Sequence, residues 1–223
     1  MAIEQQTTEA PGPSRRIWMR TAMGLWIVGL FIGARYALLY EFTPSQPRVI
    51  DTQWPAGTSC KLAPTHPTLI MFIHPRCPCS RASLSELATL MAHFQGKVET
   101  QVLFFQPQSA PADWAQTDLW QSAEVIPGVE ARTDASGIEQ QRFGARASGE
   151  AFLYQPDGEL LFHGGITTSR GHTGDNAGRD LLEAILLRQQ RTKTEAPVFG
   201  CQLQAACTLP RPATATAKTR QNP

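Results

Sequence analysis

Apolar and polar positions alternate in blocks from residue 68 onward, and these blocks predict strands and helices in turn. The apolar run at 69–73 predicts a buried strand over 68–74, because the run is short, unbroken and closed by a proline. The segment 80–94 carries apolar residues at spacings of three and four, which indicates a helix with one buried face that ends before Gly96. Its apolar positions are Leu84, Leu87, Leu90, Met91 and Phe94.

The same patterns continue to residue 190. We expect further strands over 98–105, 129–132, 151–154 and 160–163, and helices over 112–123, near 136–143 and over 179–190. Pro-Asp-Gly at 156–158 predicts a tight turn between the last two strands. Strands that alternate with helices imply a parallel pair, and the closing hairpin adds an antiparallel edge. The predicted fold is therefore α/β, with a mixed central sheet flanked by helices.

The N-terminal pattern is that of a membrane segment. Residues 21–34 are uncharged, and the stretch 17–40 exceeds the roughly 20 residues that span a bilayer if Arg20 and Arg35 extend toward the interfaces. Arg15, Arg16 and Arg20 precede the span, which favours an N-terminus inside the cell. We predict an uncleaved transmembrane helix. A cleavable signal peptide is the alternative, although residues 34–37 form a poor cleavage site.

The chain therefore divides into five predicted parts. A disordered cytoplasmic tail covers 1–16, a transmembrane anchor 17–40, a linker and entry segment 41–64 and the α/β domain 65–192. Residues 193–223 are rich in Pro, Ala, Thr and Gln and predict a flexible tail that contains two cysteines. This order places the domain outside the cytoplasm, where disulfides persist.

Composition and charge limit the classes of function that the chain can have. The formal net charge of +1 lacks the basic excess typical of proteins that bind nucleic acid. The five cysteines are an odd number, so at least one thiol is free or pairs with another molecule. Cys77 and Cys79 lie where a strand meets a helix N-terminus, and the helix dipole and the unpaired N–H groups there favour the reactive thiolate. Thiol chemistry is the function that this pattern favours.

The sequence His-Pro-Arg-Cys-Pro-Cys-Ser at 74–80 resembles the thioredoxin active-site pattern of strand, proline, Cys-x-x-Cys and helix. Cys77 takes the place of the first cysteine, Ser80 takes the place of the second, and Cys79 is inserted between them. The family's cis-proline position falls near Gly149, and the proline is absent. Together with segments 162–167 and 169–179, the motif is similar to RedB-like membrane-anchored bacterial proteins. The resemblance covers about 65–192.

This resemblance implies a thioredoxin-like fold and a redox role. We predict a single-pass protein of the inner membrane whose periplasmic domain exchanges thiols and disulfides with protein substrates. Cys77 is the expected nucleophile and Cys79 assists it. The supporting residues of the predicted site are His74, Pro75, Arg76, Ser80 and Gly149.

Two schemes remain open for the second thiol. In one, Cys77 and Cys79 cycle between dithiol and disulfide. In the other, Cys77 acts alone and is resolved by a partner or by a tail cysteine, Cys201 or Cys207. A local Cys201–Cys207 disulfide is the simpler interpretation of the tail, and Cys60 is expected to be a structural or free thiol.

No cofactor is expected, and soft-metal binding is the alternative function. Two thiolates and an imidazole, from Cys77, Cys79 and His74, would suit Cu(I). Copper-delivery proteins of the thioredoxin fold pair a Cys-x-x-x-Cys with a distant histidine, a spacing that this sequence does not match. Peroxide reduction is disfavoured because His74 stands where peroxidases carry Thr or Ser.

Overall fold

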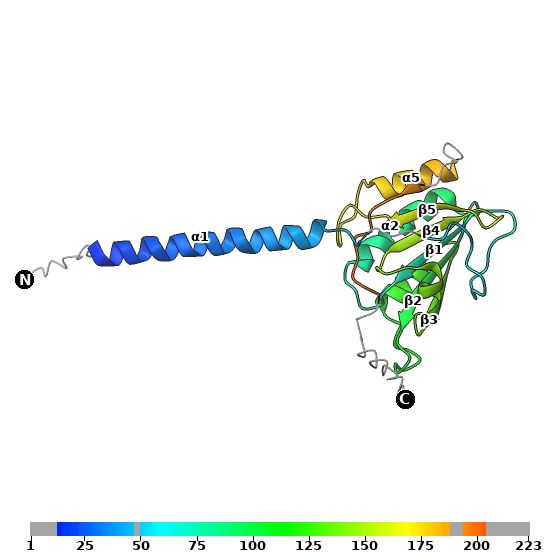
Figure 1. Cartoon of the computed structure of the whole chain (residues 1–223), viewed down its shortest axis with the longest axis horizontal. Helices are drawn as coiled ribbons and strands as arrows, with labels where there is room; N and C mark the ends of the chain where they lie inside the picture. Colours follow the sequence, from blue (N-terminus) through cyan, green and yellow to red (C-terminus); the bar gives the residue numbers. More distant parts are fainter. Residues whose placement is uncertain (1–12, 47–49, 188–193, 204–223) are drawn as a thin grey trace, which may run out of the picture. The chain divides into compact units, whose positions relative to one another are not determined.

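The computed structural model describes residues 13–46, 50–187 and 194–203 (Figure 1). The chain forms two compact units, one that extends to Thr43 and one that starts at Pro44. The first unit is the helix α1, Pro13–Phe42, whose apolar side chains are exposed around its circumference. By length and composition α1 qualifies as a membrane span, and a signal sequence near the N-terminus would qualify equally.

The second unit is built on a mixed six-stranded sheet of order β3-β2-β1-β4-β5-β6 (Figure 1). Its strands are β1 Thr68–Ile73, β2 Glu99–Gln106, β3 Val129–Ala135, β4 Glu150–Tyr154, β5 Leu160–Gly165 and β6 Thr194–Glu195. β1, β2 and β3 run parallel, β4 pairs antiparallel with both β1 and β5, and β6 runs parallel to β5. Its helices are α2 Ser80–Phe94, α3 Asp118–Glu124, α4 Ile138–Phe143 and α5 Ala177–Leu186.

The central position of β1 in the sheet explains why residues 69–73 are all apolar. All six residues are buried, because successive side chains enter hydrophobic clusters on opposite faces of the sheet. Leu69, Met71 and Ile73 pack with residues of α2, α3 and α5. Ile70 and Phe72 pack with Phe143 of α4 and with the entry segment. The prediction of a sheet with helices on both faces is confirmed.

Element boundaries differ from the sequence predictions at a few places. α2 covers the predicted residues 80–94, but α3 starts at Asp118 and not at 112. Thr117 has an extended backbone, and turns such as Gln116 N–H to Asp113 C=O fill the preceding segment, so no continuous helix forms there. α5 begins at Ala177 because the Asn176 side chain caps it by accepting from the Arg179 amide at 2.8 Å.

The entry segment before β1 is packed onto the sheet. The Trp54 amide donates to Gly158 C=O at 2.8 Å, and the Leu160 amide donates to Thr52 C=O at 2.8 Å. The Trp54 ring lies edge-on to both Phe143 and Tyr154. Backbone hydrogen bonds and the Trp54 ring therefore both hold the entry segment against the domain.

The prediction of a flexible tail over 193–223 is wrong for residues 194–203. β6 pairs with β5, the Ala196 amide donates to His163 C=O at 3.0 Å, and Val198 and Leu203 are buried. Glycine makes this approach possible, since a Cβ built on Gly165 would lie 2.9 Å from Pro197 O. Cys207 lies outside the described residues.

Candidate thiol site

Cys77 lies in the turn that joins β1 to α2. Its amide donates to His74 C=O at 3.1 Å, and its C=O accepts from the Ser80 amide at 3.1 Å, so the turn leads directly into the first turn of the helix. Cys79 occupies the N-cap position. The Cys77 side chain is only 2% exposed. The local sequence thus holds a buried thiol at the positive end of the α2 dipole, as predicted.

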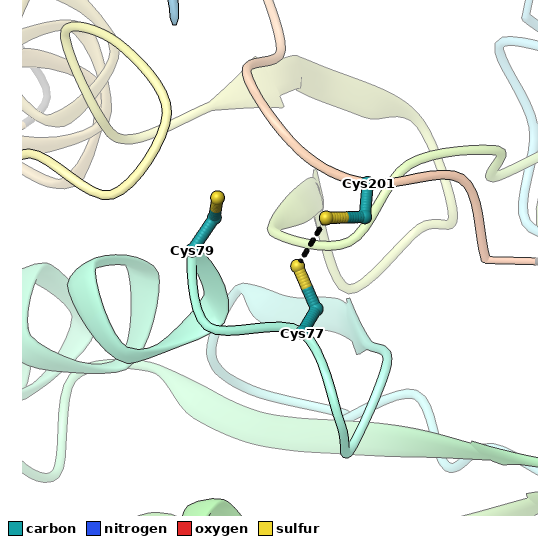
Figure 2. A group of neighbouring side chains, drawn as sticks. All are labelled: Cys77, Cys79 and Cys201. Atoms are coloured by element: carbon teal, nitrogen blue, oxygen red, sulfur yellow. Dashed lines mark hydrogen bonds between the residues drawn. The ribbon is translucent and has the colours of Figure 1, made fainter.

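A third thiol, from a distant part of the chain, completes the site. Figure 2 shows Cys77 and Cys79 on the turn before α2 and Cys201 on a separate segment that faces them. The Sγ atoms of Cys77 and Cys201 are 2.6 Å apart, and all three sulfurs lie within 4.8 Å of one another. A disulfide requires about 2.05 Å between sulfurs, so a small movement would join Cys77 to Cys201.

The three thiols have different proton affinities. Burial alone would raise the pKa of Cys77, but it is outweighed by hydrogen bonds from the Cys201 thiol, the Ser80 hydroxyl and the amides of Cys201 and Cys79, and the net effect lowers that pKa. Burial and the neighbouring Cys77 raise the pKa of Cys201 to about 12. Burial and the Cys77 charge also raise the pKa of Cys79. Cys77 is therefore the most acidic of the three thiols.

Residues 198–203, which we call the strap, carry Cys201 to this position. The Ser148 amide donates to Cys201 C=O and the Leu203 amide donates to Arg146 C=O, both at 2.8 Å. These bonds accompany an antiparallel bridge between Ala147 and Gln202. The strap therefore lies antiparallel beside the segment 146–148 and pairs with it through an isolated bridge.

Ser148 ties that segment to the cysteine turn. Its hydroxyl accepts from the His74 amide at 2.8 Å and lies 2.6 Å from the Ser80 hydroxyl. The next residue, Gly149, donates its amide to Phe72 C=O at 2.8 Å with φ at +88°, and a Cβ there would collide with the Ser83 side chain. Gly149 thus helps to hold the segment against the end of β1.

The other predicted supporting residues, at 74–76, contact β2 and the segment that precedes α3. The His74 ring stacks on Phe105 and meets Trp114 edge-on, and its Nδ1 accepts from the Arg76 amide at 3.2 Å. Burial and then the Arg76 charge lower the pKa of His74, so the imidazole is neutral at pH 7. The Arg76 guanidinium lies 4.7 Å from the centre of the Trp114 ring. Pro75 C=O accepts from the Thr117 hydroxyl at 3.0 Å.

The glycine-rich loop before α5 touches both the strap and the cysteine turn. Arg170 donates to Gly200 C=O, and its charge lowers the pKa of Cys79 against the larger effect of burial. Glu86, a buried residue of α2, anchors the loop by accepting from the Gly174 amide at 2.7 Å and by pairing with Arg179. The loop is thereby fixed next to the sulfurs.

The sequence placed the cis-proline position near Gly149 and left open a return of Cys201 toward Cys77, but it did not predict that the strap pairs with the segment 146–148. A signal for the strap was present in the glycines at 164, 165 and 200, which leave room for another backbone. The hydroxyl of Ser148 gave no signal, because its role depends on contacts with residues far away in sequence.

Comparison with known proteins found no matching family model and no matching curated protein. Among solved structures, a hypothetical protein from Sinorhizobium meliloti is 22% identical with a TM-score of 0.53, over 72% of this chain and 93% of its own. An uncharacterized conserved protein from Geobacillus kaustophilus is 16% identical with a TM-score of 0.54, over 73% of this chain and 92% of its own. A secreted Mycobacterium tuberculosis disulfide oxidoreductase is 17% identical with a TM-score of 0.39, over 55% of this chain and 81% of its own.

The order of the strands and helices identifies the fold. The unit β1-α2-β2 carries the cysteine turn, the β4–β5 hairpin lies antiparallel beside β1, and α5 follows the hairpin. This is the arrangement that the resemblance of residues 74–80 to thioredoxin implies, and it extends over the predicted domain. The protein has a thioredoxin-like fold.

Proposed function

We propose that this protein is a membrane-anchored thiol–disulfide oxidoreductase that acts on protein thiols, with Cys77 as nucleophile and Cys201 as resolving cysteine. The observation that carries the proposal is the 2.6 Å approach of the Cys201 sulfur to the Cys77 sulfur at the start of α2. Cys79 assists, because its amide and its thiol both face the same sulfur cluster. This scheme gives the resolving role to the tail and not to Cys79.

The proposed exchange balances as follows when the reduced protein meets a substrate disulfide. The Cys77 thiolate attacks one substrate sulfur, the substrate S–S bond breaks, and the departing sulfur leaves as a thiolate. Cys201 then loses its proton to that thiolate or to water and attacks Cys77 Sγ. The mixed disulfide breaks, the second substrate thiolate leaves, and Cys77 and Cys201 become oxidised by two electrons while the substrate is reduced.

The site of action forms part of the proposal. We place the protein in the inner membrane, as resembling the RedB-like proteins, with α1 as an uncleaved anchor and the domain in the periplasm. The arginines at 15, 16 and 20 support this orientation, and a periplasmic redox environment supports the chemistry. A reporter enzyme that is active only after export, fused after residue 223, should be active and membrane-bound; activity in the soluble fraction would indicate cleavage.

Disulfide mapping tests the assignment of the two thiols. The full-length chain in detergent is reduced, oxidised with glutathione disulfide and digested, and its disulfide-linked peptides are identified by mass spectrometry. We expect a Cys77–Cys201 link. The variant C201S should accumulate a mixed disulfide between Cys77 and a disulfide-bonded substrate such as insulin, whereas C79S should release it.

The matched control is C60S, which removes a thiol outside the cluster and should behave as the unmodified chain. The opposite result, in which C79S retains the mixed disulfide and C201S releases it, would give the resolving role to Cys79. Absence of any mixed disulfide in both variants would reject the exchange function.

A second candidate function rests on the same three sulfurs. Cys77, Cys79 and Cys201 offer three soft ligand atoms within 4.8 Å of one another, a donor set that suits Cu(I). Among the described residues His74 is not part of this cluster, so three thiols replace the predicted ligand set of His74, Cys77 and Cys79. Titration of the reduced chain with Cu(I) against a competing chelator should show one bound ion that C201S weakens; no binding would remove this candidate.

A further inference from the structure

The strap lies where an outside peptide would have to lie to reach Cys77. It covers the segment 146–148 with two backbone hydrogen bonds and presents a cysteine to the nucleophile. Cys77 itself is 2% exposed. A substrate sulfur therefore has no free approach along this edge while the strap is bound, and Figure 2 shows Cys201 occupying the space in front of Cys77.

Contacts along its whole length show that the strap is fitted to this edge. Val198 and Leu203 are buried at its two ends, and Val198 C=O accepts from the Ser45 amide at 2.8 Å. Arg170 donates a hydrogen bond to Gly200 C=O. Gly200 itself is required, because any Cβ at this position would collide with the carbonyl oxygen of residue 148. Leu203 inserts into the hydrophobic cluster on the α4 face of the sheet.

We propose that the strap is an internal peptide ligand of the thiol site. A substrate must displace the strap, and the substrate segment that carries the cysteine binds with the same backbone geometry. The inference rests on the proposed function. The substrate is then a polypeptide whose cysteine lies in an extended segment, with a residue as small as glycine immediately before the cysteine. It pairs antiparallel with 146–148 in place of Gln202 and its neighbours.

The step that follows displacement uses the strap again. Once the substrate sulfur is bonded to Cys77 and the substrate segment leaves the edge, the strap rebinds and brings Cys201 to the mixed disulfide. The same segment therefore restricts access before the first exchange and supplies the thiol for the second. Its attachment must be reversible, which a small number of backbone hydrogen bonds allows.

The test measures how fast a bulky maleimide alkylates Cys77 in the reduced full-length chain, with the modified peptide identified by mass spectrometry. G200A should detach the strap and raise the rate about tenfold or more, since the lost hydrogen bonds no longer hold the edge closed. R170A should raise the rate by a smaller factor and leaves the hydrophobic core untouched. Q202A is the matched control, because this side chain is exposed, and it should keep the rate of the unmodified chain.

A peptide then replaces the strap. Added to G200A, the peptide Val-Phe-Gly-Ser-Gln-Leu, which copies the strap without its thiol, should restore slow alkylation in a saturable way. The same peptide with alanine in place of glycine should not protect. Unchanged alkylation in both G200A and R170A, or equal protection by the two peptides, would overturn the proposal.

A parallel assay separates this inference from the proposed function. Reduction of a disulfide-bonded peptide is followed in the same samples. Fast alkylation of G200A, together with no disulfide reduction by the unmodified chain, would reject the exchange function and leave the strap as a ligand of the site. Normal disulfide reduction with unchanged alkylation would reject the strap and leave the exchange function.

Discussion

Cys60 and Cys77 are both buried, yet their surroundings shift the pKa values of the two thiols in opposite directions. Cys60 is 7% exposed and Cys77 2% exposed. Burial raises the pKa of Cys60 to about 11, because the Thr58 hydroxyl lowers it only in part and Glu139 adds repulsion. At Cys77 the donors from Cys201, Ser80 and nearby amides overcome a similar burial effect. Hydrogen-bond donors, and not exposure, therefore distinguish the more acidic thiol of Cys77 from that of Cys60.

The difference follows from where each cysteine lies in the fold. Cys60 belongs to the entry segment and packs into the hydrophobic cluster around Phe72 and Phe152. Cys77 lies at a helix start next to the strap, which is paired with the segment 146–148. The first environment is apolar and local, whereas the second is polar and assembled from three distant parts of the chain.

The largest difference is expected in disulfide reduction when the Cys77 thiol or the Cys60 thiol is removed. C77S is expected to lower disulfide reduction by at least about a hundredfold, because the nucleophile is lost. C60S should retain the activity of the unmodified chain. The measurement is the initial rate of insulin reduction by the full-length chain with dithiothreitol as electron source. Loss of activity in C60S with intact folding would contradict the comparison.

The pH dependence of alkylation should separate the two thiols next. Cys77 should titrate with a midpoint below the ordinary value of 9.0, so its reactivity persists as pH falls from 9 and is lost only through the lowered pKa. Cys60, with a pKa of about 11, should be about one part in a thousand thiolate at pH 8. Iodoacetamide labelling followed by peptide mass spectrometry across pH 5–10 gives both curves. Coincident midpoints would refute the assignment.

The lowered pKa also predicts a direction for stability. An acid whose folded pKa is depressed stabilises the folded state fully above the unfolded value, and this contribution disappears as pH falls through the folded value. The free energy of unfolding of the reduced chain should therefore decrease over that window relative to C77S. Urea titration of both proteins at several pH values below 9 measures it, and parallel curves would show that Cys77 is not a folded-state thiolate.

A smaller effect is expected when one donor to Cys77 is removed. C201A deletes the thiol that donates to the Cys77 sulfur and should raise the midpoint of Cys77 labelling by up to about one pH unit. C201S keeps a donor and should retain a midpoint close to that of the unmodified chain. A downward shift in C201A would mean that Cys201 does not stabilise the thiolate.

The smallest effect is expected from a substitution next to Cys60. The Thr58 hydroxyl bonds to the Glu139 carboxylate and accepts from the Cys60 amide at 3.1 Å. T58V should lower the free energy of unfolding by about 1 kcal/mol and leave the Cys77 labelling midpoint in place. T58S keeps the hydroxyl and serves as the control. A changed Cys77 midpoint in T58V would show that the two regions are coupled.

Local sequence patterns predicted most of the regular structure. The apolar run of β1, the helical spacing of α2 and the Pro-Asp-Gly turn each record a local constraint, so their limits were placed within one or two residues. The cysteine turn was also visible, since a proline and two cysteines between a strand and a helix are typical of a reactive thiol site. The sequence predicts a longer α3 than the structure shows. The apolar residues at 114 and 115 belong to turns that precede α3, and they pack against the hydrophobic core from there.

The relations between distant segments could not be predicted in this way. The sequence predicts His74 as a supporting residue or a Cu(I) ligand, but its ring packs against Phe105 and Trp114, outside the cluster of three thiols. Cys201 was weighed as a resolving thiol against a local disulfide with Cys207, and nothing in its neighbours along the chain favoured the first. Backbone pairing with residues 146–148 settles its position.

The sequence by itself determined that this chain has an apolar N-terminal helix and an α/β domain with a thiol at a helix start, because hydrophobic periodicity and turn residues act over a few positions. Only the tertiary structure decided which sulfur faces Cys77, which donors lower its pKa and which segment covers it. Those outcomes depend on burial and on hydrogen bonds between residues far apart along the chain, and such contacts leave little trace in local sequence.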